Sequence, residues 1–125
     1  MSLTKDILII DDEATIVDFM TEALTDEGYA VRAAQDAQQG LSQIEALPPA
    51  LVLLDLHMPG MSTIELVEHV RSNGFSTLPL VIMTADQSAP KYLADCPDFT
   101  YLFKPFDLDT LMECVSRFIP PSTTR

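Results

Sequence analysis

The sequence predicts a single α/β domain, a doubly wound parallel sheet with helices on both faces. Apolar runs alternate with amphipathic stretches along all 125 residues, a length typical of one domain. Three of the runs, ILII, LVLL and LVIM, are continuously apolar, as expected of strands that are buried on both faces. Strands separated by helices must run parallel, with right-handed crossovers.

Five strand–helix pairs are expected in chain order. The predicted strands are residues 5–10, 29–34, 50–54, 79–83 and 99–103, and the predicted helices are 14–27, 36–46, 62–72, 86–95 and 107–118. Gly28 stands where the first helix should be capped, and Pro48 and Pro49 interrupt the chain before the third strand. The helix at 86–95 has the weakest pattern because it contains Pro90, so we expect it to be short, irregular or mobile.

Composition excludes several classes of protein. A net charge of -12 argues against direct nucleic-acid binding, which needs clustered Lys and Arg, and favours a basic partner or a cation. No apolar run approaches the roughly 20 residues of a membrane span, and the N-terminus lacks a signal-peptide pattern, so a cytoplasmic protein is expected. Cys96 and Cys114 lack metal-ligand spacing, which favours free thiols over a disulfide.

Polar side chains follow several predicted strands at the point where each strand ends. Asp11 and Asp12 follow the first strand, Asp55 the third, Thr84 the fourth and Lys104 the fifth. Singly, the acidic pair could cap a helix, the threonine could be a turn residue and the lysine a surface charge. In a parallel sheet, however, these strand ends share one edge, where ligands bind. The sequence therefore predicts a site at this edge.

The predicted site favours a divalent cation. Two carboxylates roughly 4 Å apart repel by about 4 kcal/mol at an effective dielectric near 20. Lys104 supplies one positive charge, and a hard ion with oxygen ligands, such as Mg²⁺, would supply the rest. Asp55 then becomes a plausible nucleophile toward a phosphoryl group. Lys104 and the ion would neutralise negative charge on the transferred group, and the Thr84 hydroxyl could donate a hydrogen bond to a phosphoryl oxygen.

The chain resembles the receiver domain of two-component response regulators. The resemblance rests on ILIIDDE at 7–13, LLDLHMPGM at 53–61, MTA at 83–85 and YLFKPF at 101–106, in this order and at this spacing. It covers nearly the whole chain. It implies a flavodoxin-like sheet with the strand order 2-1-3-4-5 of the chemotaxis regulators.

By this resemblance, Asp55 is the phosphoacceptor and Lys104 contacts the phosphoryl group. Mg²⁺ (or Mn²⁺) would be bound by Asp55, by Asp12 directly, by Asp11 through water and by the backbone carbonyl of His57. Such a domain is a signalling module rather than an enzyme, since it catalyses only its own phosphorylation and slow dephosphorylation.

The resemblance also implies a switch. Thr84 would move toward the phosphoryl group, the Tyr101 rotamer would follow, and the face formed by the fourth helix, fifth strand and fifth helix would change. A cis peptide is expected between Lys104 and Pro105. His57 and Asp86, each two residues beyond a site residue, either tune the phosphoryl lifetime or are merely exposed loop residues.

Two stretches depart from the family pattern. Ser62-Thr63 stands where the family usually has Asp-Gly, which predicts a different loop conformation beside the site. Residues 97–100, Pro-Asp-Phe-Thr, replace the usual Gly-Ala before Tyr101. The catalytic set is intact, whereas the output surface is atypical.

The implied partners are a histidine kinase or phosphotransfer protein and a downstream protein or fused output domain. Residues 1–119 would form the receiver domain, and 120–125 reads equally well as a tail or a linker stump. One alternative is a vestigial receiver that acts as a phosphorylation-independent scaffold. A phosphohydrolase with an aspartyl-phosphate intermediate is less favoured, because such sites generally place a second acid two residues after the nucleophile, where this chain has His57.

Overall fold

The computed structural model describes residues 6–56, 61–89 and 100–120. Five parallel strands form one sheet in the order β2-β1-β3-β4-β5, which confirms the predicted α/β fold and strand order. The strands are β1 (Asp6–Ile10), β2 (Ala30–Ala34), β3 (Leu51–Asp55), β4 (Leu80–Thr84) and β5 (Thr100–Phe103). The described helices are α1 (Ala14–Asp26), α2 (Ala37–Ala46), α3 (Thr63–Ser72) and α5 (Leu108–Ser116).

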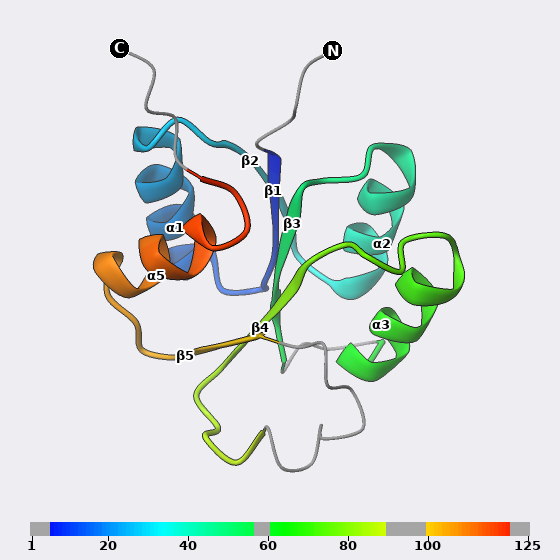
Figure 1. Cartoon of the computed structure of the whole chain (residues 1–125). Coiled ribbons are helices and arrows are strands. Elements are labelled where there is room, and N and C mark those ends of the chain that lie inside the picture. Colours follow the sequence, from blue (N-terminus) through cyan, green and yellow to red (C-terminus); the bar gives the residue numbers. More distant parts are fainter. Residues whose placement is uncertain (1–5, 57–60, 90–99, 121–125) are drawn as a thin grey trace.

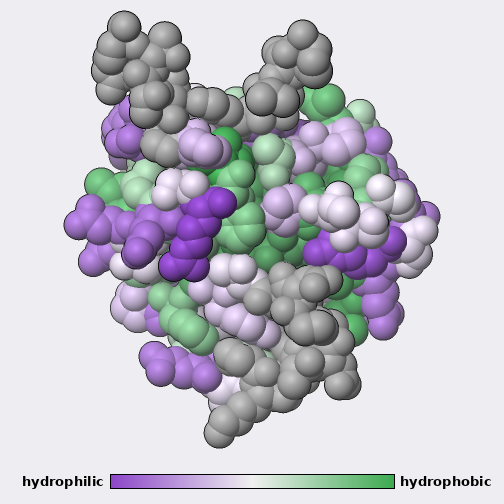
Figure 2. Space-filling model, viewed as in Figure 1, coloured by the Kyte–Doolittle hydropathy of each residue, from purple (hydrophilic) through white to green (hydrophobic). Residues whose placement is uncertain are grey.

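Helices cover both faces of the sheet (Figure 1). Helices α1 and α5 lie on one side, and α2 and α3 lie on the other. Successive side chains of a strand point to opposite faces, so Ile7 and Ile9 join the α1/α5 core while Leu8 and Ile10 join the α2/α3 core. Hydrophilic residues cover the helices on either side, and hydrophobic ones are visible mainly between them (Figure 2). This two-sided burial explains the continuous apolar runs.

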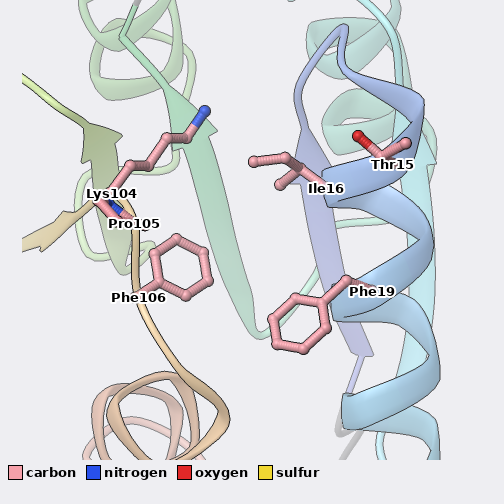
Figure 3. Close-up of a pocket in the computed structure, with 6 residues that line it drawn as sticks. All are labelled: Thr15, Ile16, Phe19, Lys104, Pro105 and Phe106. Atoms are coloured by element: carbon pink, nitrogen blue, oxygen red, sulfur yellow. The ribbon is translucent and has the colours of Figure 1, made fainter.

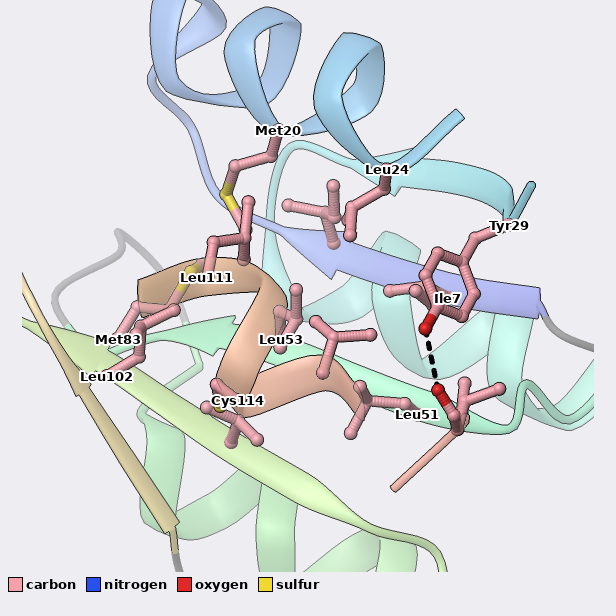
Figure 4. Packing of buried hydrophobic residues seen from close by; sticks show 14 residues of the cluster. Ile7, Met20, Leu24, Tyr29, Leu51, Leu53, Met83, Leu102, Leu111 and Cys114 are labelled. Atoms are coloured by element: carbon pink, nitrogen blue, oxygen red, sulfur yellow. Dashed lines mark hydrogen bonds between the residues drawn. The ribbon is translucent and has the colours of Figure 1, made fainter. Parts of the chain in front are cut away.

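In the α1/α5 core, Tyr29, just before β2, is bonded to Ile119, just after α5 (Figure 4). Tyr29 is 4% exposed, and its hydroxyl donates a hydrogen bond of 2.6 Å to the carbonyl of Ile119. Burial, and secondarily the charge of Glu27, raises the pKa of the tyrosine. The hydroxyl therefore stays protonated and keeps its bond at physiological pH.

Local hydrogen bonds explain where several helices begin. The side chains of Asp36, Ser62 and Asp107 accept hydrogen bonds from the first turns of α2, α3 and α5. The hydrogen bonds from Thr110 lower the pKa of Asp107. The cap of α5 therefore weakens only as the pH falls through that lowered pKa. Helix α3 has a complete capping box, in which the Ser62 hydroxyl accepts from the Glu65 amide and the Glu65 carboxylate accepts from the Ser62 amide. Gly28 follows α1 with φ of 95°, consistent with its predicted capping position.

The structure corrects one predicted detail and leaves another largely outside the described residues. The apolar spacing in 62–72 predicts that Ile64, Val67 and Val70 lie on the buried side of that helix. The structure buries Thr63, Leu66, Val67 and Val70 and leaves Ile64 half-buried, so the buried face of α3 is centred on other residues than the apolar pattern indicates. In the predicted helix at 86–95, residues 87–88 form a turn and residue 89 is helical, while residues 90–95 lie outside the described part of the chain, so this helix stays a prediction.

The structure bears on the predictions about the cysteines and about membrane spans. Cys114 is a buried free thiol whose pKa is raised by burial, while Cys96 falls in the undescribed segment. None of the helices in the described ranges is long and apolar enough to cross a membrane.

Helix α2 approaches β1 closely at Gly40. A methyl group at this position would overlap Ile10 Cδ1 and stand 2.9 Å from Ile10 Cγ1. Helix propensity alone predicts that Gly40→Ala stabilises the protein by about 1 kcal/mol. We expect instead a net loss of about 1–3 kcal/mol in the free energy of unfolding, because the core is overpacked. Urea denaturation measures this value.

Ile10→Val removes the overlapping methyl group and provides the control. The double variant should be more stable than the sum of the two single effects predicts. Additive effects would show that the contact between Gly40 and Ile10 does not cause the loss of stability in Gly40→Ala.

Candidate functional site

Asp11, Asp55 and Lys104 meet at the C-terminal edge of the sheet. The register of β1 and β3 pairs Ile10 with Leu54, so the next residues, Asp11 and Asp55, are neighbours. Lys104 directly follows β5, and its ammonium lies 3.2 Å from Asp11 Oδ2 and 3.2 Å from Asp55 Oδ1. The structure thus brings together residues that are separated by up to 93 positions in the chain.

Asp55 and Thr84 are the last residues of their strands rather than the first residues after them, which corrects the predicted strand ends. Sheet pairing continues one residue further than the apolar runs. The Leu56 amide donates to the Met83 carbonyl at 2.9 Å, and the Lys104 amide donates to the Thr84 carbonyl at 2.8 Å. The backbone that carries the site is therefore part of the rigid sheet.

Three carboxylates lie close enough together that they could hold a metal ion. One oxygen from each of Asp11, Asp12 and Asp55 lies within 4.8 Å of the others. Asp11 and Asp55 are 1% and 5% exposed, while Asp12 is exposed. Asp11 and Asp12 also line an open pocket of about 390 Å³, which leaves room for water ligands.

Asp11 has a second role at the start of α1. Its Oδ1 accepts a hydrogen bond of 2.9 Å from the Glu13 amide. This bond precedes the helix and does not cap it, since α1 begins after Glu13 without a side-chain cap. The two oxygens of Asp11 thus face different partners, the Glu13 amide and the Lys104 ammonium.

Charge balance at the cluster favours a divalent cation. Burial by itself lowers the pKa of Lys104, but the carboxylates of Asp55 and Asp11 outweigh it, and the pKa is raised. The ammonium is thus charged at neutral pH. One positive charge against the three carboxylates of the cluster leaves a charge of about -2, which one divalent ion offsets. The oxygen donors fit Mg²⁺.

Thr84 lies at the end of β4, next to β3, with 1% exposure. Its Oγ1 accepts a hydrogen bond of 3.0 Å from the Asp86 amide. The Asp86 carboxylate accepts bonds from the amide and hydroxyl of Ser88, at 2.9 and 2.6 Å. Asp86 therefore organises the turn after β4.

Tyr101 lies on β5, half-buried against the α2/α3 core. Its ring stacks on Phe103, with centroids 5.9 Å apart and planes 10° from parallel. The peptide between Lys104 and Pro105 is cis, which confirms that prediction. His57 lies outside the described residues.

Two residues beside the site were missed from the sequence. Glu13 places Oε1 3.4 Å from the Lys104 ammonium, on the exposed side, and its position directly after the acidic pair was the available signal. Thr63 is 5% exposed and donates to the Leu56 carbonyl at 3.0 Å. Its only signal is the departure at Ser62-Thr63, which by itself predicts a different loop conformation.

An apolar pocket of about 230 Å³ borders the site (Figure 3). The rings of Phe19, from α1, and Phe106, from the segment after β5, face each other across it. The Lys104 amino group points away from these rings toward the end of β3. The aliphatic stem of the lysine thus lines the pocket while its charge belongs to the carboxylate cluster.

Known proteins share both this sequence pattern and this fold. The family model of the response regulator receiver domain matches residues 7–116. The response regulator MprA of Mycolicibacterium vanbaalenii is 34% identical over 108 residues, which cover 85% of this chain and 46% of that protein. The chain therefore spans less than half the length of this relative.

Two solved structures match nearly the whole chain. Chemotaxis protein CheY4 of Vibrio cholerae has a TM-score of 0.85 and 26% identity, covering 94% of this chain and all (100%) of that one. Response regulator protein TrrA of Thermotoga maritima, solved in complex with Mg²⁺-BeF, has a TM-score of 0.83 and 29% identity, covering 93% of this chain and 100% of that one. Together with the family match, these likenesses show that the chain belongs to the response regulator receiver domain family.

Proposed function

We propose that this domain accepts a phosphoryl group on Asp55 from a histidine kinase or phosphotransfer protein and signals by changing its protein contacts. One observation carries the proposal. The Asp55 carboxylate ends a fully buried strand, 3.2 Å from the Lys104 ammonium and within 4.8 Å of two further carboxylates. A nucleophile, a cation and a set of metal ligands are thus held on rigid elements.

In the proposed reaction, an Asp55 oxygen attacks the phosphorus while the bond to the donor nitrogen breaks and the electron pair leaves with the donor. Lys104 already contacts the nucleophile, so its charge is placed to stabilise the negative oxygens of the transferred group. The buried strand keeps the carboxylate oriented toward the incoming phosphorus. A bound divalent ion would supply further charge neutralisation.

The metal would be held by Asp55, by Asp12 directly and by Asp11 through water, with the backbone carbonyl of His57 as a further ligand. The carboxylate cluster supports the assignment of the three aspartates. Mg²⁺ suits this set because it retains several waters and takes few carboxylates; Mn²⁺ accepts the same oxygen ligands.

The proposed switch begins at Thr84. Its hydroxyl would turn toward a phosphoryl oxygen, which disturbs the bond from the Asp86 amide that orders the turn after β4. Tyr101 would then change its packing against the α2/α3 core. The contact face would comprise β5, α5 and the segment 86–95. His57 and Asp86 are proposed to tune the phosphoryl lifetime.

Residues 1–119 are proposed to form the receiver, with 120–125 as a tail or a linker to a downstream domain. The output would be a separate protein or a fused domain, as the greater length of MprA suggests. The net charge of -12 supports a role without direct nucleic-acid binding.

Asp55→Asn tests the phosphoacceptor. After incubation with a small-molecule phosphodonor and Mg²⁺, intact mass should show one phosphoryl adduct on the parent protein. The adduct should be absent from the variant and should not form without Mg²⁺, because the amide is not a nucleophile and the uncompensated charge repels the donor. A folded parent protein that binds Mg²⁺ but gains no mass would support the vestigial scaffold instead.

Asp12→Ala tests the metal ligands. We expect Mg²⁺ binding, measured by titration calorimetry, to be lost because a direct carboxylate ligand is removed. Asp18→Ala is the matched control, since Asp18 lines the same pocket but is not part of the carboxylate cluster. Equal affinity in Asp12→Ala and the parent protein would exclude the metal assignment.

Lys104→Met tests the charge balance. Removing the ammonium should strengthen Mg²⁺ binding about tenfold, because the ion no longer competes with a cation for Asp11 and Asp55. The pKa of Lys104 is raised above its ordinary value of 10.5, so the ammonium is charged at about pH 7 and at about pH 9. The difference in Mg²⁺ affinity between the variant and the parent protein should therefore be the same at both pH values. Phosphorylation should nevertheless slow. Weaker binding in the variant would contradict the proposed charge balance.

A further inference from the structure

We propose that Thr63 is a positioning residue for phosphoryl transfer. Its hydroxyl holds the C-terminal end of β3, so that the Asp55 carboxylate keeps its orientation toward Lys104. The inference rests on the proposed function and deepens it by adding a residue that touches neither the phosphoryl group nor the metal.

The contact joins α3 to the last peptides of β3. Thr63 Oγ1 lies 3.0 Å from the Leu56 carbonyl oxygen and 3.4 Å from that of Asp55. A hydroxyl has one hydrogen to donate, so the shorter contact with Leu56 receives the better bond. Thr63 is only 5% exposed, which limits the access of water to these carbonyls.

The hydroxyl is available because another residue caps the helix. A threonine at the start of a helix commonly bonds to the amides of its own first turn. In α3 the Ser62 hydroxyl accepts the bond from the Glu65 amide, and the Glu65 carboxylate accepts the bond from the Ser62 amide. The Thr63 hydroxyl therefore points back to β3 instead.

This bond completes the anchoring of Leu56, the residue after Asp55. The Leu56 amide donates to Met83 of β4, and its carbonyl accepts from Thr63. Both peptide planes that flank Leu56 are thus held, at the point where strand pairing ends. Without the hydroxyl, the second plane loses this bond, and the backbone that orients Asp55 gains freedom.

Small displacements matter at this position. The Asp55 oxygen lies 3.2 Å from the Lys104 ammonium, and transfer requires both to face the same phosphoryl group. Misplacing a reacting group by about 1 Å can slow a reaction by a factor on the order of 100. A partial loss of orientation predicts a decrease of about tenfold in the rate of phosphorylation.

The test compares Thr63→Val, which keeps the shape and removes the hydroxyl, with Thr63→Ser, which keeps the hydroxyl. Thr63→Ala is the second variant if the valine does not fold. The rate constant for adduct formation is measured by intact mass at saturating Mg²⁺ with a small-molecule phosphodonor. We expect a decrease of about tenfold for Thr63→Val and a rate within about twofold of the parent for Thr63→Ser.

Ser62→Ala is the matched control because it breaks the capping box of the same helix and leaves the hydroxyl of Thr63 in place. It should lower stability but not the rate of phosphorylation. A parent-like rate in Thr63→Val, or an equal loss in Ser62→Ala, would overturn the proposal.

Amide hydrogen exchange at Leu56, followed by NMR, separates this inference from the proposed function. Exchange should be faster in Thr63→Val than in Ser62→Ala, whether or not Asp55 is phosphorylated. If the parent protein takes up no phosphoryl group, the proposed function fails, while unchanged exchange in Thr63→Val overturns the anchoring role itself.

Discussion

The interaction between Lys104 and the two buried carboxylates of Asp11 and Asp55 is the constraint on which the site depends. The neighbouring strands β1 and β3 place these two carboxylates side by side at almost no exposure. Their repulsion would be unfavourable in such a site without a positive charge between them. The ammonium meets this requirement because β5, paired with β4 at the far end of the sheet, brings Lys104 to the same edge.

The two apolar cores give this edge its rigidity. Residues of β1, β3 and β4 are buried on both faces, so the strands that carry the acidic residues and Thr84 cannot shift independently. The strands at the sheet edges differ. Three of the four residues of β5 are only half-buried, and Tyr101 and Phe103 stack there on each other. A rigid centre beside a less buried edge suits a domain in which a local charge change alters an outer surface.

The Ser62-Thr63 departure shows how one substitution is accommodated. Losing a glycine predicted a changed loop, and residues 57–60 lie outside the described structure. At 62–63 themselves, no left-handed backbone is required, since Ser62 has φ of -73° and caps α3. The additional side chain of Thr63 is buried and bonded to β3. The substitution therefore adds a contact beside the site.

The order and approximate bounds of the described elements, and the residues of the carboxylate cluster, were predictable from sequence. Apolar periodicity is a local property, and parallel strands necessarily bring their C-terminal ends to one edge. The strand order itself and the cis peptide came from the family resemblance.

Tertiary structure decided the rest. The approach of Glu13 to Lys104, the bond from Thr63 to β3 and the stacking of Tyr101 on Phe103 depend on register and on the direction of each side chain. Hydrophobic pattern does not encode these directions for polar residues, as the burial of Thr63 in place of Ile64 illustrates. The sequence by itself determined which groups reach the edge of the sheet, and packing determined which of them touch.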